Sequence, residues 1–405
     1  MIDSRTKPLG GESLPLSQAA GRVLAVSVHV ADSFPPFARA AMDGFAIRGA
    51  ETLGACRSTP ARFRVLGESR PGVGFDGRIG PGDAVLIMTG APMPDGGDCV
   101  VKVESATLVA DIVEVNEPTP PGRHVGRIGE DLPEGLVIFR AGRRLRPQDL
   151  GVLSAMGRAE INVVKRPRVT IIVTGAELLP PGTPPSGFRI PDMNSVMLAP
   201  LIERDGGIAT ILGPFPDQRA ILRSTLREAS KSSDIVLVSG GSSTGPEDHA
   251  PSLVGELGTL DVHGVALRPA GPTGLGWIGG TPVVLLPGNP VSCLCAYDFF
   301  GGRIVRQLAG RDRHWPYRQV DRPLATRLAS VPGRVDYTRV YLDETGVEPL
   351  ATSGASILSS TSRADGFVVV PSDSEGYPAG AVVTVWRYDD ETSQVSPLPH
   401  EGLAP

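Results

Sequence analysis

The chain has 405 residues, a net charge of -5 and 41% hydrophobic residues, which suits two to four domains, each with a packed core. The negative charge and the lack of a long basic block argue against nucleic acid as the main partner. No apolar run approaches the ~20 residues of a membrane-spanning helix, and residues 1–10 contain no apolar core of a signal peptide. The four cysteines show no metal-site spacing. We therefore expect a cytoplasmic protein with free, buried thiols at Cys56, Cys99, Cys293 and Cys295.

The N-terminal part is predicted to combine a helical region with a small β domain. Apolar residues recur at helical spacing after residue 14. Further on, short strands alternate with turns rich in Gly, Pro and Asp, which is typical of a β domain. The expected elements are a helix over 14–25, a β domain over 33–119 with strands at 61–66 and 84–88, and a helix over 147–156.

The next part, over residues 166–310, reads as alternating strands and helices. Residues 169–173 form a continuous apolar run, as expected of a strand buried on both faces. The alternation predicts a doubly wound, mostly parallel α/β sheet, whose ligands bind at the carboxyl ends of the strands. The expected elements are helix 194–205, strand 209–212, helix 217–230, strand 234–239, helix 248–256, strand 260–267, strand 282–286, helix 290–308, and then a second β domain over 323–395.

Two turns that follow buried strands predict a cradle for a phosphate or another oxyanion. Backbone N–H groups in such turns, and the positive end of a following helix, point at an anion. Pro290 suits the first turn of the helix, where a missing N–H has no cost. The two turns are Ser239-Gly240-Gly241-Ser242 and Pro287-Gly288-Asn289-Pro290.

Four carboxylates follow strands or precede helices at the same predicted edge: Glu177, Asp192, Asp217 and Asp248. Beside a phosphate cradle, such a set indicates Mg2+ bridging the phosphates. For Asp192 and Asp217, capping of the next helix is the simpler interpretation. Asp248 favours the metal, because it follows a glycine-rich loop. Arg268 is either a ligand for an anion or an ordinary surface arginine.

Seven short segments, in order along the chain, carry a resemblance that extends from Leu14 to Trp386. They are Ala41–Phe45, Met88–Pro92, Gly129–Asp131, Thr174–Leu178, Ser239–Gly241, Leu286–Ser292 and Ser362–Gly366. Together they resemble the molybdopterin molybdenumtransferase family, which includes MoeA and the gephyrin E domain. The resemblance implies insertion of molybdenum from molybdate into adenylylated molybdopterin, with Mg2+ and release of AMP.

The resemblance also implies an architecture and an assembly. We expect a homodimer with active sites between subunits, and the molybdopterin adenylyltransferase as a further partner. The implied domains are a discontinuous helical and extended linker domain (1–34 and 120–165), a β-rich insertion domain (35–119), a central α/β domain (166–315) and a C-terminal β-barrel domain (316–405).

Residue by residue, the family's cofactor or metal positions fall on Asp43, Thr89, Glu177, Asp217, Asp248, Pro287, Pro290 and Ser360. Of these we expect catalytic roles for Asp43, Thr89, Glu177 and Asp248, and metal binding by Glu177, Asp217 and Asp248. Cofactor contacts are expected from Ser239, Gly240, Gly241, Ser242, Arg268, Pro287, Gly288, Asn289, Pro290 and Ser360.

The chain departs from the family pattern at several positions. It has Phe37-Ala-Arg-Ala40 where Phe-Asp-Asn-Ser is usual, Ala176 in place of Asp, Pro246 in place of Glu, and Gly264 and Gly271 in place of Lys. The lost cations leave a second hypothesis open: a weakened paralogue that binds molybdopterin or a protein partner as a scaffold. The carboxylates Asp43, Glu177 and Asp248 favour the enzyme. Transfer of tungstate is a third hypothesis, since its charge and shape match those of molybdate.

Overall fold

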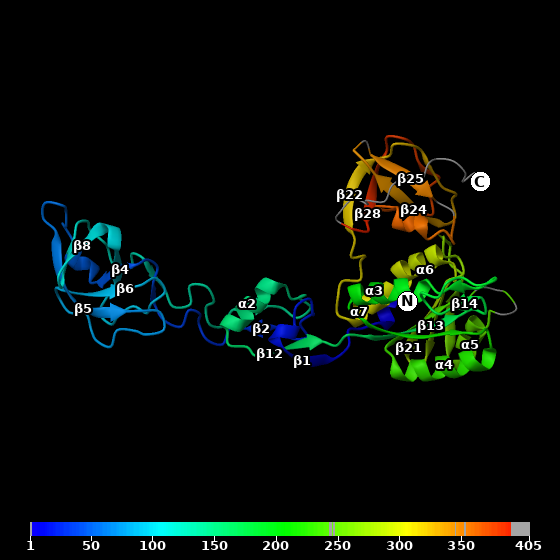
Figure 1. The fold of residues 1–405 in the computed structure, drawn as a ribbon, viewed down its shortest axis with the longest axis horizontal. Helices are drawn as coiled ribbons and strands as arrows, with labels where there is room; N and C mark the ends of the chain where they lie inside the picture. The colour runs from blue at the N-terminus through cyan, green and yellow to red at the C-terminus, as the bar shows by residue number, and fades with distance from the viewer. Residues whose placement is uncertain (1, 243–244, 246–247, 345, 352–353, 390–405) are drawn as a thin grey trace. The chain divides into compact units, whose positions relative to one another are not determined.

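The computed structural model describes residues 2–242, 245, 248–344, 346–351 and 354–389 (Figure 1). The chain divides into two compact units, Ser13–Asn162 and a second unit made of Met1–Glu12 with Val163–Pro405. Among the described residues, no helix is long and apolar enough to cross a membrane.

The unit Ser13–Asn162 contains a six-stranded sheet in the order β7-β4-β6-β5-β9-β8. A glycine is required at position 44, where β4 pairs with β7, because a Cβ there would lie 1.8 Å from the Val101 carbonyl oxygen. The strands are β4 (Gly44–Ile47), β5 (Ala61–Ser69), β6 (Asp83–Ile87), β7 (Cys99–Lys102), β8 (Ala106–Val109) and β9 (Ile112–Val115). Three separate two-stranded sheets are also formed: β1 (Gly11–Pro15) with β12 (Glu160–Val164), two strands that extend past the ends of this unit, β2 (Val28–His29) with β11 (Val137–Phe139), and β3 (Arg39–Ala40) with β10 (Val125–Gly126).

One helix of this unit was predicted correctly and one was not. Helix α2 (Pro147–Ala155) lies where it was expected. The helix predicted over 14–25 is wrong: the segment holds the end of β1 and a single 3-10 turn over Leu16–Gln18. Gly21 has φ +72°, a left-handed backbone conformation that is incompatible with an α-helix through this residue. The apolar residues that suggested a helix are nevertheless buried, including Ala19, Val23 and Leu24, because an irregular chain can bury them as well as a helix can.

The second unit contains a central sheet in the order β16-β13-β17-β21-β20-β18. The first four strands are parallel, β20 is antiparallel to β21, and β18 is antiparallel to β20 and therefore runs in the same direction as the first four, so the predicted mostly parallel α/β sheet is confirmed. The strands are β13 (Arg168–Thr174), β16 (Ile208–Phe215), β17 (Ile235–Ser239), β18 (Thr259–His263), β20 (Gly274–Ile278) and β21 (Thr281–Leu286), and the helices are α1 (Ile2–Arg5), α3 (Asn194–Asp205), α4 (Arg219–Ser232), α5 (Ala250–Leu257), α6 (Pro290–Ala296) and α7 (Gly302–Leu308).

Helices cover both faces of this sheet, as a doubly wound fold requires (Figure 1). Successive side chains of a strand point to opposite faces. On β13, Ile171 packs in one core cluster with residues of α3, α6 and α7. Its neighbour Ile172 packs in a second cluster with residues of α4 and α5.

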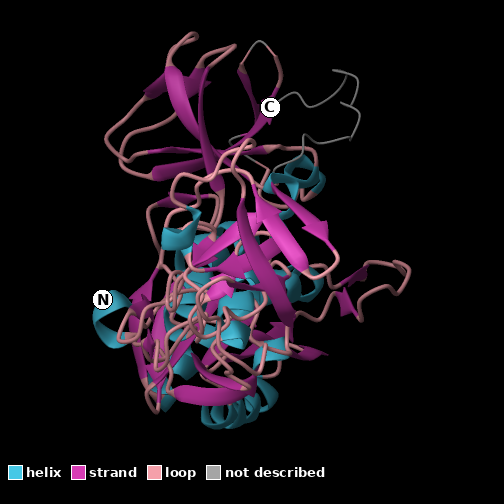
Figure 2. Cartoon of the chain, turned by 90° about the vertical axis from the view of Figure 1, so that its left-hand side faces the viewer, coloured by secondary structure: helices cyan, strands magenta, loops and turns pink. Residues whose placement is uncertain are grey.

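The C-terminal part of this unit is rich in strands (Figure 2). Its sheet has the order β19-β24-β26-β28-β22, with β25 paired to β24. Strand β19 comes from the chain just before β20, so the two sheets are connected through it. The elements are β14 (Leu178–Leu179), β15 (Ile190–Pro191), β19 (Leu267–Arg268), β22 (Arg318–Pro323), β23 (Leu328–Ala329), β24 (Val335–Leu342), β25 (Val347–Ala351), α8 (Ser359–Ser362), β26 (Gly366–Val370), β27 (Gly376–Tyr377) and β28 (Val382–Arg387).

The cysteines are free thiols, but they are not all buried. Cys99, Cys293 and Cys295 are buried, as expected. Cys56 is exposed, which corrects the expectation for that residue. It lies between the 3-10 turn Gly49–Thr52 and β5, where its Sγ is 3.1 Å from the Ser58 hydroxyl.

A buried network of charges lies where α3, α6 and α7 meet. The helix predicted over 290–308 is interrupted by a π-helical turn at Tyr297–Gly301, which buries both Tyr297 and Asp298. Asp205, the last residue of α3, accepts hydrogen bonds from Tyr297 Oη (3.0 Å) and Arg306 Nη1 (2.9 Å). Buried charges need such partners.

The second carboxylate of the network faces Tyr317 and Arg204. Tyr317 Oη donates to Asp298 Oδ1 at 3.0 Å, and Arg204 Nη2 lies 3.4 Å from the same oxygen. Burial raises the pKa of Asp298 to about 6, although the nearby arginine charges act to lower it.

Replacement of Asp298 by Asn should therefore change how stability depends on pH. The folded carboxyl keeps a proton between about pH 4 and 6 that the unfolded one has lost, so its contribution to stability falls as pH rises through that window. Relative to Asp298→Asn, the wild type should lose on the order of 3 kcal/mol between pH 4 and 7. Urea unfolding followed by tryptophan fluorescence measures this, since Trp277, Trp315 and Trp386 all lie in this unit. Asp373→Asn, at an exposed site, is the control; equal pH dependence in all three proteins would contradict the prediction.

Candidate functional site

A cavity of about 540 Å³ opens at the carboxyl ends of β13, β17 and β21. This is where ligands bind in open α/β sheets. The lining residues come from the loops that follow these strands and from the start of α3. Those that the sequence singled out are Glu177, Asp192, Asp217, Ser239, Gly240, Gly241, Ser242, Asp248, Pro287, Gly288, Asn289 and Pro290.

Glycines let the turns after β13 and β17 approach each other closely. Gly240 has φ +96°, and a Cβ on it would lie 2.1 Å from the carbonyl oxygen of Thr174. Any other residue would therefore push the two strand ends apart. Gly288, from the turn after β21, lies close enough that its Cβ would be 3.7 Å from the Gly240 Cα. The three turns thus form one continuous backbone surface.

Asn194 connects two of these turns, although the sequence did not single it out. Its Nδ2 donates to Ser239 Oγ at 2.9 Å and to the Gly288 carbonyl oxygen at 2.8 Å. The side chain is buried at the first position of α3. A buried Asn that bridges two loops fixes their spacing. Its only signal in the sequence was a polar residue at the start of a predicted helix.

Two of the four predicted carboxylates hold the protein's own backbone. Asp217 accepts from Thr174 Oγ1 (2.7 Å) and from the Ala176 N–H (2.9 Å), which fixes the loop after β13. Asp192 accepts from the N–H groups of Asn194 (3.0 Å) and Ser195 (3.2 Å). Asp192 thus caps α3, as the simpler interpretation had it. Asp217 does not cap α4, because its contacts are with the loop 174–176.

Glu177 and Asp248 are the carboxylates best placed to meet a ligand. Glu177 is exposed at the cavity. Asp248 Oδ2 accepts from the Gly245 N–H at 2.7 Å, and its other oxygen faces no partner among the described hydrogen bonds. The Pro246 departure lies outside the described residues.

The two carboxylates at this cavity suit a Mg2+ ion that is bound partly by phosphate oxygens better than one bound by protein side chains alone. Among the described residues, no group of three or more His, Cys, Asp or Glu side chains could hold a metal ion. Mg2+ in phosphate sites is commonly held by one or two carboxylates, with phosphate oxygens and waters completing the shell. In the part of the chain that the structure describes, the cavity lining also contains no Lys, Arg or His. A phosphate here would need a cation to offset the surrounding carboxylates.

Arg268 and Ser360 do not line this cavity. The Arg268 guanidinium pairs with the buried Asp336 of β24, which also accepts from Ser330 Oγ at 2.7 Å. These contacts are those of a structural ion pair and give no support to the predicted anion contact. Ser360 is buried and donates to the Ile357 carbonyl oxygen at 2.6 Å. Ser356, which the sequence did not single out, lines the cavity instead.

Asp43 and Thr89 form a separate pair in the unit Ser13–Asn162. Strands β4 and β6 are neighbours, and they bring together the residues just before one and just after the other. Asp43 Oδ1 accepts from the Thr89 N–H (2.7 Å) and from Thr89 Oγ1 (2.8 Å). These hydrogen bonds lower the pKa of Asp43. The pair therefore presents an ionised, oriented carboxylate on the surface of its unit.

Substitution of Gly240 should damage the site far more than substitution of Gly288. Gly240→Ala places a Cβ against the Thr174 backbone at a positive φ, which should destabilise the protein by a few kcal/mol. Gly288→Ala meets only ordinary van der Waals contact and should change stability by less than about 1 kcal/mol. Thermal unfolding of both variants tests this. Equal midpoints would show that the two turns are not in close contact.

Comparisons with known proteins agree along the chain. Three family models match: the MoeA N-terminal region (domain I and II) over residues 1–157, a probable molybdopterin binding domain over 170–307, and the MoeA C-terminal region (domain IV) over 321–388. Molybdopterin molybdenumtransferase 2 of Mycobacterium tuberculosis is 33% identical, with 92% of this chain and 94% of that protein covered. The molybdopterin molybdenumtransferase of Haemophilus influenzae is 29% identical, with 95% and 96% covered.

A solved structure shows that the fold is shared as well. The molybdopterin biosynthesis MoeA protein from Pyrococcus horikosii superposes with a TM-score of 0.85 at 31% identity, and the match covers 96% of this chain and 97% of that one. The resemblance predicted from the seven segments is therefore confirmed, and the chain belongs to the MoeA family of molybdopterin biosynthesis proteins.

Proposed function

We propose that this protein is a molybdopterin molybdenumtransferase, which inserts molybdenum from molybdate into adenylylated molybdopterin in a Mg2+-dependent reaction that releases AMP. The observation that carries the proposal is the cavity at the strand ends, where three Gly-containing turns meet beside Glu177 and Asp248. The relatives reported above support it, because they bear this name over nearly the whole length of the chain.

The protein's own groups have clear tasks in this reaction. The N–H groups of Gly241 and Gly288, in the turns after β17 and β21, bind phosphate oxygens, whereas the Gly240 N–H donates to the Leu286 carbonyl oxygen at 3.3 Å. Asn194 keeps the turns at a fixed spacing, and Asp217 keeps the loop after β13 in place. Glu177 and Asp248 would hold Mg2+, which supplies positive charge to the phosphates when it is bound.

We also propose a homodimer in which each active site draws on both subunits. The cavity is built by the second unit alone, whereas the predicted catalytic residues Asp43 and Thr89 belong to the unit Ser13–Asn162. A shared site, as the family resemblance implies, lets both sets serve one reaction. We retain the four-domain division (1–34 with 120–165, 35–119, 166–315 and 316–405) as part of this proposal. A cytoplasmic location and contact with the molybdopterin adenylyltransferase stay predictions.

One observation favours the second candidate, a weakened paralogue that binds molybdopterin or a protein as a scaffold. Among the described residues, no basic side chain lines the cavity, and Arg268 is paired with Asp336. An oxyanion such as molybdate or tungstate would have to rely on backbone N–H groups, Mg2+ or a cation from a second subunit. Measured AMP release on addition of molybdate decides between enzyme and scaffold.

Replacement of Asp248 by Ala should abolish Mg2+-dependent turnover. The carboxylate that is lost is one of the two proposed to hold the ion. Glu256→Ala is the control, since Glu256 is an exposed carboxylate on α5 that pairs with Arg219 outside the cavity. AMP release is measured against Mg2+ concentration. A variant whose Mg2+ dependence matches that of the wild type would remove Asp248 from the metal site.

The purified protein should have the mass of a homodimer. Its mass by light scattering at micromolar concentration should be close to twice the 42.4 kDa of one chain. A monomer mass would contradict the shared site. A second test mixes the inactive variants Asp43→Ala and Asp248→Ala. If the sites are shared between subunits, mixed dimers should regain part of the activity, whereas monomers would regain none.

A further inference from the structure

Phe188 is fully exposed at the tip of the loop that joins β14 to β15. The tip is a tight turn, in which the N–H groups of Ser186 and Arg189 each donate to the other residue's carbonyl oxygen, at 3.1 and 3.0 Å. A single exposed apolar side chain is common on a protein surface. The meaning of this one therefore depends on what lies within its reach.

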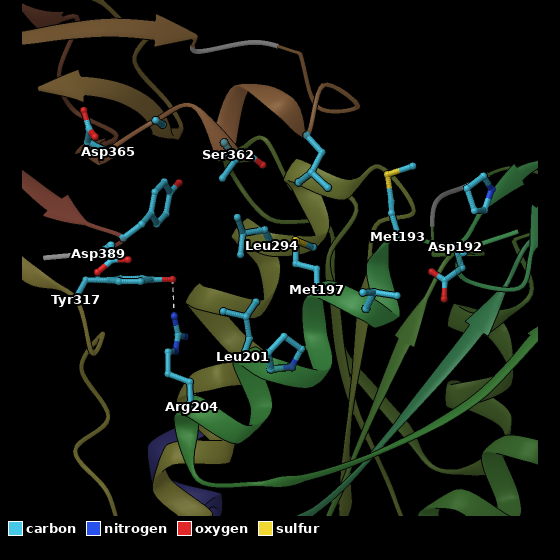
Figure 3. Close-up of a pocket in the computed structure, with 18 residues that line it drawn as sticks. Asp192, Met193, Met197, Leu201, Arg204, Leu294, Tyr317, Ser362, Asp365 and Asp389 are labelled. Atoms are coloured by element: carbon cyan, nitrogen blue, oxygen red, sulfur yellow. Dashed lines mark hydrogen bonds between the residues drawn. The ribbon is translucent and has the colours of Figure 1, made fainter. Parts of the chain in front are cut away.

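The loop begins and ends at the rim of a second cavity, of about 1080 Å³, in the same unit (Figure 3). Gly182 and Pro191, which enclose residues 183–190, both line this cavity. Much of its wall is apolar and belongs to helices α3 and α6. Val196 of this wall is 55% exposed, so its side chain can still gain an apolar partner. The other apolar residues of the wall include Met197, Leu201 and Leu294, which are labelled in Figure 3.

The base of the loop is fixed, whereas its arm has few contacts. Strand β14 pairs with β15 at the base, and the Arg189 guanidinium donates to the Leu178 carbonyl oxygen at 2.8 Å. Every hydrogen bond described for residues 182–188 stays within the loop. A Cβ on Gly182 or Gly187, at φ +76° and +60°, would meet none of the described atoms within 4 Å. The arm can therefore turn about its two glycines while the base stays in place.

Phe188 can reach the near wall of the cavity from this base. It is two residues from Ile190, and each residue spans at most ~3.6 Å, so the two Cα atoms can lie up to ~7 Å apart. The ring extends beyond its own Cα. Pro191 and Met193 follow Ile190 and line both cavities, and Val196 comes next, in the first turn of α3. The ring can therefore contact the wall with β14 and β15 still paired.

We propose that residues 180–189 form a lid over the second cavity, and that Phe188 closes it by packing on Val196 and Met197. Closure removes the apolar surfaces of the ring and of the wall from water together, which is favourable. The structure shows the open position. In the closed position the ring covers the wall, so any apolar ligand of this cavity competes with Phe188. The lid is independent of the transferase function, since it requires only the loop and the cavity.

A disulfide between the two contact positions tests closure in the full-length protein. Cys56→Ser is the background, because Cys56 is the thiol that is exposed. Phe188→Cys combined with Val196→Cys should form a disulfide within one chain on oxidation. Phe188→Cys combined with Glu203→Cys is the control, since Glu203 is an exposed residue of α3 that does not line the cavity. The first pair should crosslink at least about tenfold faster, because closure gives its thiols a high effective concentration.

Shielding of the wall is a second measure of closure, and it needs no crosslink. In the same background, the thiol introduced by Val196→Cys should react with Ellman's reagent at least about threefold faster when Phe188→Ser is added, because only open molecules expose it. The thiol introduced by Glu203→Cys should react at the same rate with and without Phe188→Ser.

The substituted positions are all exposed, so the variants should fold. Equal crosslinking of the two pairs, or a labelling rate at position 196 that Phe188→Ser leaves unchanged, overturns the lid. A disulfide that joins two chains, in place of one within a chain, also overturns it, because Phe188 would then dock on a second copy of the protein.

Discussion

The contact between Gly240 and the Thr174 carbonyl sets the geometry of the proposed phosphate site. It brings the ends of two parallel strands within a distance that leaves no space for a Cβ. The turn after the third strand completes the surface, and Asn194 holds it to Ser239 by side-chain hydrogen bonds. The carboxylates at the edge take their positions from these turns: Asp217 from the loop 174–176, and Asp248 from Gly245.

Helix α3 links this surface to the interior of the unit. Its first residue joins the turns, its exposed side lines the second cavity of about 1080 Å³, and its last residue, Asp205, is buried in the charge network with Arg306 and Tyr297. The network fixes the far end of the helix, so the position of the cavity wall depends in part on the buried charges of Asp205 and Arg306, which do not line the cavity. Asp205 interacts with Arg204, Arg306 and Tyr297, and these contacts restrict where the end of α3 can lie.

The sequence predicted a residue's role correctly where that role depends on neighbours along the chain. It failed where the role depends on residues that are distant in the sequence. The apolar run 169–173 and the glycine turns predicted the sheet and the cavity at its edge. Strand β20 was missed because its glycines resemble a turn; Gly276 is in fact required there, since a Cβ would lie 2.3 Å from the Thr259 carbonyl oxygen. The sequence left Arg268 as either an anion ligand or a surface arginine, because its ion-pair partner in the structure, Asp336, is 68 residues away.

Pro191, Asp192 and Met193 line both the cavity at the strand ends and the second cavity over α3, which has a consequence for the turnover of any ligand long enough to span the two. Two ends joined in one molecule bind as a bivalent ligand, because once one end is bound the other is present at a high effective concentration. Cleavage between the ends abolishes that advantage without any movement of the protein. Each fragment is then held only by its own cavity, so the chemical step itself would convert a tightly bound substrate into two products that dissociate independently.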